Sequence, residues 1–136
     1  MPNSTWGISL ANKLPKEEWN FIRRECYKNA GYRCEVCFSN VDSLNAHELW
    51  KFDDRKLLQI FNGLECCCIL CHDVHHFGRS SMVYELPRIE ELIRHWCKVN
   101  KLRYKDFQQH RDEVNALSLK RASKVYTVMI GKRVLL

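Results

Sequence analysis

The 136-residue sequence predicts a small α+β fold. Apolar side chains recur at three- and four-residue spacing after Pro15 and after Pro87, which is typical of helices that bury one face. Segment 44–50 reads as a short strand, and two Cys-x-x-Cys pairs stand on either side of it. Helices, a strand and paired thiols together predict a modest core that a bound metal helps to hold.

Proline and glycine residues divide the chain into its predicted elements. Pro15 opens a helix that Gly31 ends, Pro87 opens a second long helix, and a third is predicted over 104–119. The shorter predicted elements are a strand over 6–10, a turn over 34–37, the strand over 44–50, a helical turn over 55–61 and a turn at 62–63. Segment 125–134 is predicted as a strand or hairpin with Gly131 at its turn. It would pair with segment 6–10, because each alone leaves an open edge.

The two thiol pairs, Cys34–Cys37 and Cys68–Cys71, are the sequence form of a tetrahedral zinc site closed by four thiolates. Eight cysteines in a secreted chain would suggest disulfides, but residues 1–11 lack the basic and apolar regions of a signal peptide. No apolar run is long enough to predict a membrane span. Reduced thiols that bind zinc in the cytoplasm are therefore the preferred interpretation, with Cys66 and Cys67 as packing residues.

The net charge of +6 is concentrated in the C-terminal third of the chain. Residues 98–136 hold ten Lys or Arg against three Asp or Glu, whereas residues 1–97 hold twelve against thirteen. This asymmetry favours a surface that binds phosphates, as in a nucleic-acid-binding protein. The candidate phosphate contacts are Arg79, Lys120, Arg121 and Lys124.

Three histidines follow the last thiolate of the second pair. His72 and His76 are four residues apart, so on a helical turn their side chains would share one face. This spacing suits a second metal site. One metal that builds the fold and another that carries chemistry point to a nuclease.

The order Cys34-x-x-Cys37, His47, Cys68-x-x-Cys71-His72-x-x-x-His76 resembles the HNH endonuclease superfamily. Stretches 30–37, 46–50 and 71–79 are similar to a bacterial and phage branch of it. The resemblance implies a zinc-stapled ββα-metal core over 33–79. We then expect a single domain over 1–136, with a helical extension over 87–119 and a C-terminal strand or hairpin over 123–136.

The resemblance also implies roles for individual residues. His47 matches the general base that activates water for attack on a phosphodiester. His72 and His76 match the residues that face the catalytic cation, Mg²⁺ or Mn²⁺, which would stabilise charge on the leaving oxygen. Cys34, Cys37, Cys68 and Cys71 match the structural zinc ligands, and Asn62 lies close to the asparagine that orients the base.

The sequence departs from the family pattern at two places. Asp or His commonly precedes the base as a metal ligand, but here that position is Ala46. Spacing from the second thiol pair puts the asparagine position nearest Gly63, so Asn62 is one residue away. A ligand could instead come from Glu48 or Asn45. Because side chains alternate along a strand, Asn45 shares the face of His47 and Glu48 does not.

Three functions follow from these observations. The first is a metal-dependent DNA endonuclease or nickase with His47 as base. The second is an HNH-like zinc protein that has lost catalysis and acts by binding, either as a DNA-binding factor or as a phage-type inhibitor of another protein. The intact histidines favour the first, and Ala46 and Gly63 favour the second. A zinc-ribbon transcription accessory factor would explain the thiol pairs but not the histidines.

Overall fold

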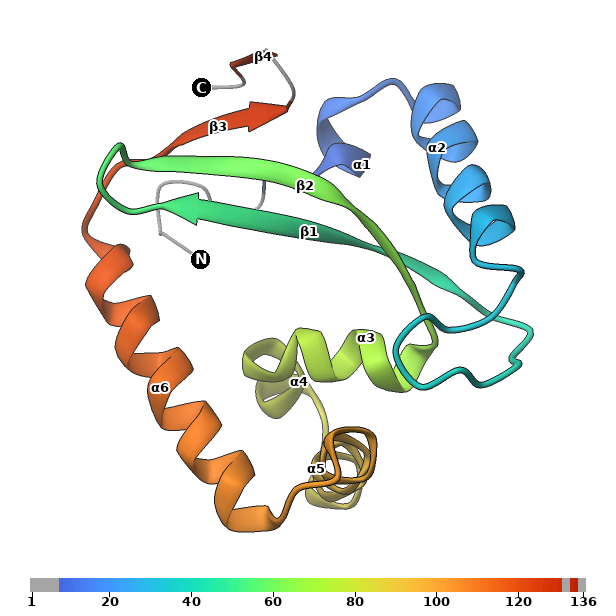
Figure 1. Ribbon diagram of the computed structural model, residues 1–136, viewed down its shortest axis with the longest axis vertical. Helices are drawn as coiled ribbons and strands as arrows, with labels where there is room; N and C mark the ends of the chain where they lie inside the picture. The colour runs from blue at the N-terminus through green and yellow to red at the C-terminus, as the bar shows by residue number, and fades with distance from the viewer. Residues whose placement is uncertain (1–7, 131–132, 135–136) are drawn as a thin grey trace.

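The computed structural model describes residues 8–130 and 133–134. Within these residues it has six helices and a four-stranded sheet, which confirms the α+β class (Figure 1). The helices are α1 (Leu10–Lys13), α2 (Lys16–Asn29), α3 (Ile69–His75), α4 (Phe77–Val83), α5 (Leu86–Asn100) and α6 (Tyr104–Ala122). The strands are β1 (Asn45–Asp53), β2 (Leu58–Cys67), β3 (Thr127–Ile130) and β4 (Arg133–Val134).

The long hairpin of β1 and β2 is the centre of the fold (Figure 1). The sheet order is β1-β2-β3-β4, with β2 and β3 parallel and the other neighbours antiparallel. The predicted strand over 44–50 is thus confirmed, and it runs on to Asp53. The helical turn predicted over 55–61 is wrong. The Asp53 carboxylate accepts hydrogen bonds from the backbone N–H groups of Arg55 and Lys56 at 3.1 and 2.9 Å, which turns the chain so that β2 begins at Leu58.

Asn62 and Gly63 lie inside β2 and do not end it. Glu48 pairs with Leu64 and Trp50 pairs with Phe61, so two residues of β2 stand opposite one residue of β1. This is a β-bulge, and Gly63 supplies the φ of 101° that a side chain rarely tolerates. The turn predicted at these residues is therefore wrong, although the glycine is used for its backbone freedom.

Of the strands predicted near the two ends of the chain, the structure confirms the C-terminal one. Of the strand predicted over 6–10, Trp6 and Gly7 lie outside the described residues. Leu10 instead begins α1, where the Ser9 side chain accepts a hydrogen bond from the Asn12 N–H and caps the helix. The C-terminal hairpin is confirmed by the pairing of β3 with β4, and the other edge of β3 pairs with β2. Gly131 falls outside the described residues.

The three long helices begin and end close to their predicted bounds. α2 starts after Pro15 and ends before Gly31, which has a φ of 65°. In α5, Pro87 occupies the first turn, and α6 extends three residues beyond the predicted end at 119. Phe107 joins α6 to α4 and α5, because its ring packs against Phe77 of α4 at 5.0 Å and Trp96 of α5 at 5.3 Å between centroids.

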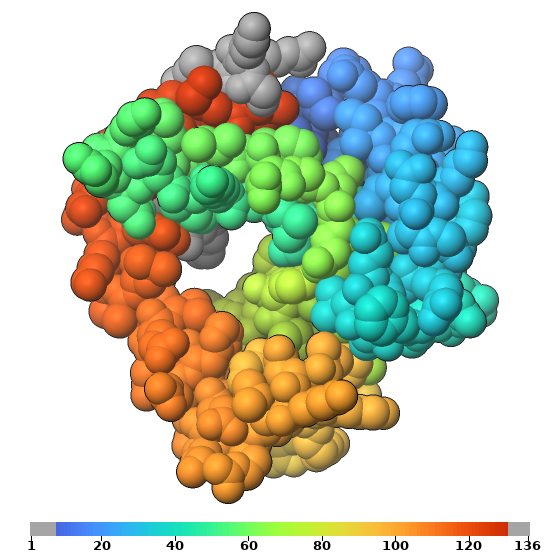
Figure 2. All heavy atoms as spheres, in the orientation of Figure 1, coloured from blue at the N-terminus to red at the C-terminus, as the bar shows by residue number. Residues whose placement is uncertain are grey.

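The far end of α6 is fixed to the β1–β2 turn. Arg121 donates to both carboxylate oxygens of Asp54 at 2.9 and 3.1 Å, and the Tyr126 hydroxyl donates to the same carboxylate at 2.6 Å. The chain therefore closes on itself around a hollow, which Figure 2 shows between α6, the β1–β2 hairpin and helices α3 to α5. Among the residues that the structure describes, no helix has both the length and the apolar character to cross a membrane.

Candidate metal centres

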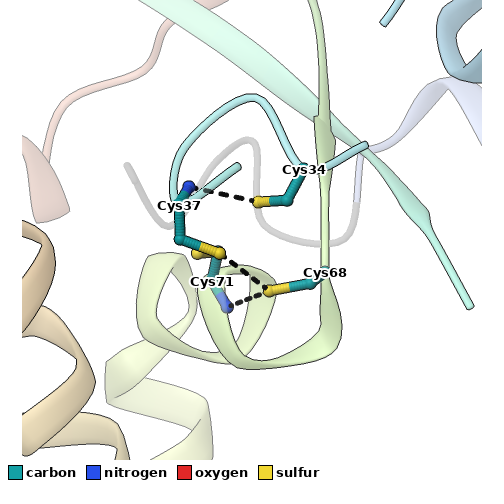
Figure 3. Close-up of side chains that lie close together, drawn as sticks. All are labelled: Cys34, Cys37, Cys68 and Cys71. Carbon is teal, nitrogen blue, oxygen red and sulfur yellow. Dashed lines mark hydrogen bonds between the residues drawn. The ribbon is translucent and has the colours of Figure 1, made fainter. Parts of the chain in front are cut away.

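The four predicted cysteines come together from two separate turns (Figure 3). Cys34 and Cys37 lie in the loop after α2, and Cys68 and Cys71 lie where β2 passes into α3. Their sulfur atoms all lie within 4.8 Å of one another, and those of Cys37 and Cys68 are 3.7 Å apart. These four cysteines could therefore bind a metal ion.

Backbone hydrogen bonds prepare both turns for thiolates. The N–H of Cys37 donates to the sulfur of Cys34, and the N–H of Cys71 donates to the sulfur of Cys68, each at 3.5 Å. Burial raises the pKa of the Cys37 thiol, but hydrogen bonds from Ser39, Cys34 and Cys68 outweigh it and lower that pKa to about 7. Burial and the neighbouring sulfurs raise the pKa of Cys71. Thiolates packed this closely repel one another, and a divalent cation relieves that repulsion.

A second group consists of the three predicted histidines. His47 lies on β1, His72 lies in α3, and His76 follows the last residue of that helix. Their ring nitrogens offer one ligand atom each within 4.8 Å of one another. The ring centroids of His72 and His76 are 4.7 Å apart, as expected for residues one helical turn apart. A strand and a helix thus bring three imidazoles into one site.

The electrostatics of this histidine group favour neutral rings. Burial, followed by the three neighbouring histidines, lowers the pKa of His47 to about 3. Burial, followed by His72 and His75, lowers the pKa of His76 to about 4. A neutral imidazole is the form that donates a lone pair to a metal ion.

His75, Glu65 and Cys67 form a further group that the sequence analysis did not recognise as a site. The Nε2 atom of His75 lies 2.8 Å from an oxygen of Glu65, and its ring stacks on His47 with 4.3 Å between centroids. Glu65 stands directly opposite His47 in the β1–β2 pairing. The alternation of Glu65 and Cys67 could have signalled one shared face, but only if segment 58–67 had been recognised as a strand.

The two remaining predicted catalytic residues stand apart from the histidine group. Asn62 is exposed at the bulge of β2. Glu48 accepts a hydrogen bond from the backbone N–H of Leu10 at 2.6 Å and another from Trp50 Nε1 at 3.2 Å. Burial raises the pKa of this carboxyl group. Glu48 thus ties α1 to the face of β1 opposite His47.

A basic groove of about 780 Å³ opens beside the histidine group, between α4 and α6. His75 and His76 line it together with three arginines, Arg79, Arg111 and Arg121, and no acidic side chain is among the lining residues. Arg79 is exposed. Arg121 is held by Asp54 and lies over the Phe52 ring at 4.2 Å. The other two predicted phosphate contacts, Lys120 and Lys124, are exposed at the end of α6 and just beyond it.

His95 of α5 contacts the cysteine group, although no role was predicted for it from the sequence. Its Nε2 atom lies 3.0 Å from the sulfur of Cys71, beside a smaller cavity of about 340 Å³. A ring nitrogen at this distance orients the sulfur and modulates its charge.

Comparison of the chain with models of protein families, with curated proteins and with solved structures found no match.

Proposed function

We propose that the protein is an HNH-type, metal-dependent endonuclease or nickase whose fold is held by a structural zinc ion. The observation that carries the proposal is the group of three imidazoles, His47, His72 and His76, brought together by β1 and α3, together with the basic groove that His76 lines. Two strands followed by a helix with this histidine arrangement are what the resemblance to the HNH superfamily implies.

Zinc suits the cysteine group because four thiolates in a tetrahedron are its usual structural ligands. Cys34 and Cys68 are 0 and 3% exposed, so a bound ion would have little access to solvent. The two N–H to sulfur bonds are made before any ion is added, which reduces the cost of ordering the ligands.

The histidine group fits a divalent cation that accepts nitrogen ligands. Imidazole suits Zn²⁺ or Ni²⁺, whereas carboxylate and water oxygens suit Mg²⁺ and Mn²⁺. Bound there, a cation would supply Lewis acidity to a phosphate oxygen and stabilise the leaving oxygen. His72 and His76 share one end of α3 and would hold it. His47 lies on strand β1 and would take the proton from the attacking water. Burial and the neighbouring histidines lower the pKa of His47 and so favour its neutral ring, which is the form that accepts a proton.

The groove supports a nucleic acid as substrate. Arg79 is exposed on one wall, and Arg111 lies over the Phe77 ring at 5.0 Å on the other, so two guanidinium groups flank the path to the histidines. Arginine binds phosphate oxygens through paired N–H groups, which would hold the backbone of one strand against the site.

The test is incubation of supercoiled plasmid with the protein and Mg²⁺, Mn²⁺, Ni²⁺ or Zn²⁺ in turn. We expect cleavage with at least one cation, and a loss of about 10²- to 10⁴-fold in rate for His47→Ala, as for removal of a general base. His110→Ala is the matched control, because that ring stacks on Trp96 between α5 and α6, outside the histidine group. Equal cleavage by wild type and His47→Ala would overturn the proposed site.

One observation favours a second candidate, a protein that binds without cutting. The histidine group contains no carboxylate, and Glu48 is turned away to Leu10. A phage-type inhibitor of another protein belongs to this same alternative. DNA binding with no cleavage under any of the four cations would establish the binding function in place of the enzyme.

A further inference from the structure

The unexpected group of Glu65, Cys67 and His75 has its own structural basis. Glu65 and Cys67 are two residues apart on β2, so their side chains point to the same face of the hairpin. Helix α3 crosses this face and brings His75 onto it. The Cys67 sulfur is 3.4 Å from the Glu65 oxygen that His75 contacts at 2.8 Å, and all three ligand atoms lie within 4.8 Å of one another.

We propose that Glu65, Cys67 and His75 form a third cation site, distinct from the cysteine and histidine groups, which takes a zinc-like divalent ion. One oxygen, one sulfur and one nitrogen are the ligand types that Zn²⁺ and Co²⁺ accept together, whereas Mg²⁺ and Ca²⁺ prefer oxygen alone. The inference does not rest on the proposed nuclease activity, since the site can be filled whether or not the protein cuts DNA.

The distances decide in favour of this group. Zinc bonds of about 2.0 to 2.3 Å in a tetrahedron separate neighbouring ligand atoms by about 3.3 to 3.7 Å. The 3.4 Å between sulfur and carboxylate already falls in this range, and the 2.8 Å between imidazole and carboxylate requires the His75 ring to move by only about half an ångström.

An ordinary ion pair of His75 with Glu65 would explain only two of the three residues. Cys67 is 0% exposed and packs in the cysteine cluster, yet its sulfur lies 3.4 Å from an oxygen of the Glu65 carboxylate. The side chains of His75 and Glu65 are 33 and 26% exposed, so an ion can reach the sulfur from their side. A buried thiol with an imidazole and a carboxylate in front of it is a ligand set open on one side, where water or a substrate oxygen completes the coordination.

Cobalt distinguishes this site from the other two. Protein carrying zinc in the cysteine group is titrated with Co²⁺, with zinc content followed by elemental analysis so that exchange into that group is detected. A thiolate bound to Co²⁺ gives a charge-transfer band in the near ultraviolet, whereas the histidine group has no sulfur. We expect the band to appear while zinc is retained, and to be lost in Cys67→Ser and weakened at least tenfold in apparent affinity in His75→Ala.

Cys66→Ser is the matched control. Cys66 is also 0% exposed and is the next residue along β2, but its side chain points to the opposite face. It should keep the band. Because Cys67→Ser could fold poorly, Glu65→Gln provides a second test at a partly exposed residue. It should also weaken the charge-transfer band. Two results would overturn the third site. One is cobalt binding that gives visible bands but no charge-transfer band, and the other is cobalt uptake no greater than the amount of zinc released. Neither result bears on plasmid cleavage and its dependence on His47.

Discussion

The imidazole rings of His47 and His75 stack face to face, with 4.3 Å between centroids and 6° between planes. One ring belongs to the group with His72 and His76, and the other belongs to the group with Glu65 and Cys67. Positive charge on one ring therefore disfavours positive charge on the other. Substitution of His75 will disturb both groups, so Cys67 variants separate them more cleanly.

We expect one tightly held zinc ion in the cysteine group, and its loss in Cys34→Ser. Zinc binding of about 10 to 16 kcal/mol in small domains is largely folding free energy, so this variant should unfold or melt far below wild type. Elemental analysis and circular dichroism provide the measurement. Cys97→Ser, a half-buried cysteine of α5 outside the group, should keep both zinc and fold. Well-folded protein without zinc would contradict the structural role.

An added carboxylate should act only on the correct face of β1. Asn45 pairs with Cys67 and so shares the face of His47 and Glu65, whereas Ala46 pairs with Cys66 on the other face. Asn45→Asp should lower the cation concentration for half-maximal binding by roughly tenfold, because one more anionic ligand is supplied. Isothermal titration with Mn²⁺ measures this. Ala46→Asp should leave the cation affinity unchanged. An equal gain in affinity in both variants would mean that the ions bind elsewhere than on the face of β1 that carries His47.

DNA affinity should fall steeply with salt, because each phosphate contact contributes about −0.9 to the slope of log affinity against log salt. Arg79→Ala and Lys120→Ala should each flatten this slope by about 1. Lys16→Ala removes the same charge at the start of α2, away from the groove, and should leave the slope unchanged. Fluorescence anisotropy at several salt concentrations measures it. A common slope for all these variants would place the DNA on another surface.

The Asp54 carboxylate should stabilise the protein at neutral and mildly acidic pH. Hydrogen bonds from Arg121 and Tyr126 lower its pKa to about 2, below the ordinary value of 3.8. Because the folded-state pKa is depressed, the stabilisation is fully present above about pH 4 and is lost only as the pH falls through about 2. Asp54→Asn should therefore lower the melting temperature by a few degrees, equally at pH 7 and pH 5. Asp112→Asn on α6 is the control, and a difference that shrinks between pH 7 and pH 5 would assign the effect to a histidine.

The bulge makes Gly63 intolerant of a side chain. At a φ of 101°, alanine is strained even though no atom lies within 4 Å of the added carbon, so Gly63→Ala should cost roughly 1 to 3 kcal/mol. Gly78→Ala is the matched substitution in helix α4, where the added carbon meets only Arg111 Nη2 at 3.9 Å. It should be neutral or stabilise by up to about 1 kcal/mol. Denaturant unfolding compares the two, and equal effects would show that the bulge is not needed.

Local signals predicted the features that depend on neighbours in the sequence. Helix α2 follows from the spacing after Pro15 and the glycine at its end, and the cysteine group follows from two short repeats. His72 and His76 meet because one helical turn separates them. Each Cys-x-x-Cys pair and the two histidines span only a few residues, so their spacing in the sequence already fixes their geometry.

The start of β2 and the Glu65 group could not be predicted in the same way. Asn62-Gly63 is a strong turn signal, and only the pairing of Glu48 with Leu64 and of Trp50 with Phe61 makes it a bulge. The parallel pairing of Leu58 with Thr127 joins residues far apart in the chain. Without β2, Glu65 and Cys67 could not be placed on a common face with His75.

The extra residue at the bulge changes which residues of β2, even-numbered or odd-numbered, point to a given face of the hairpin. Before it, the residues of β2 that pair on the His47 side of the hairpin are even-numbered, Leu58 and Ile60; after it they are odd-numbered, Glu65 and Cys67. A regular ladder through the same residues, without the bulge, would force a choice. Either the half of the hairpin next to β3 keeps its faces, or the half next to α3 does, but not both. In the first case the composition of the chain is unchanged, yet Cys66 would stand where Cys67 now faces the carboxylate.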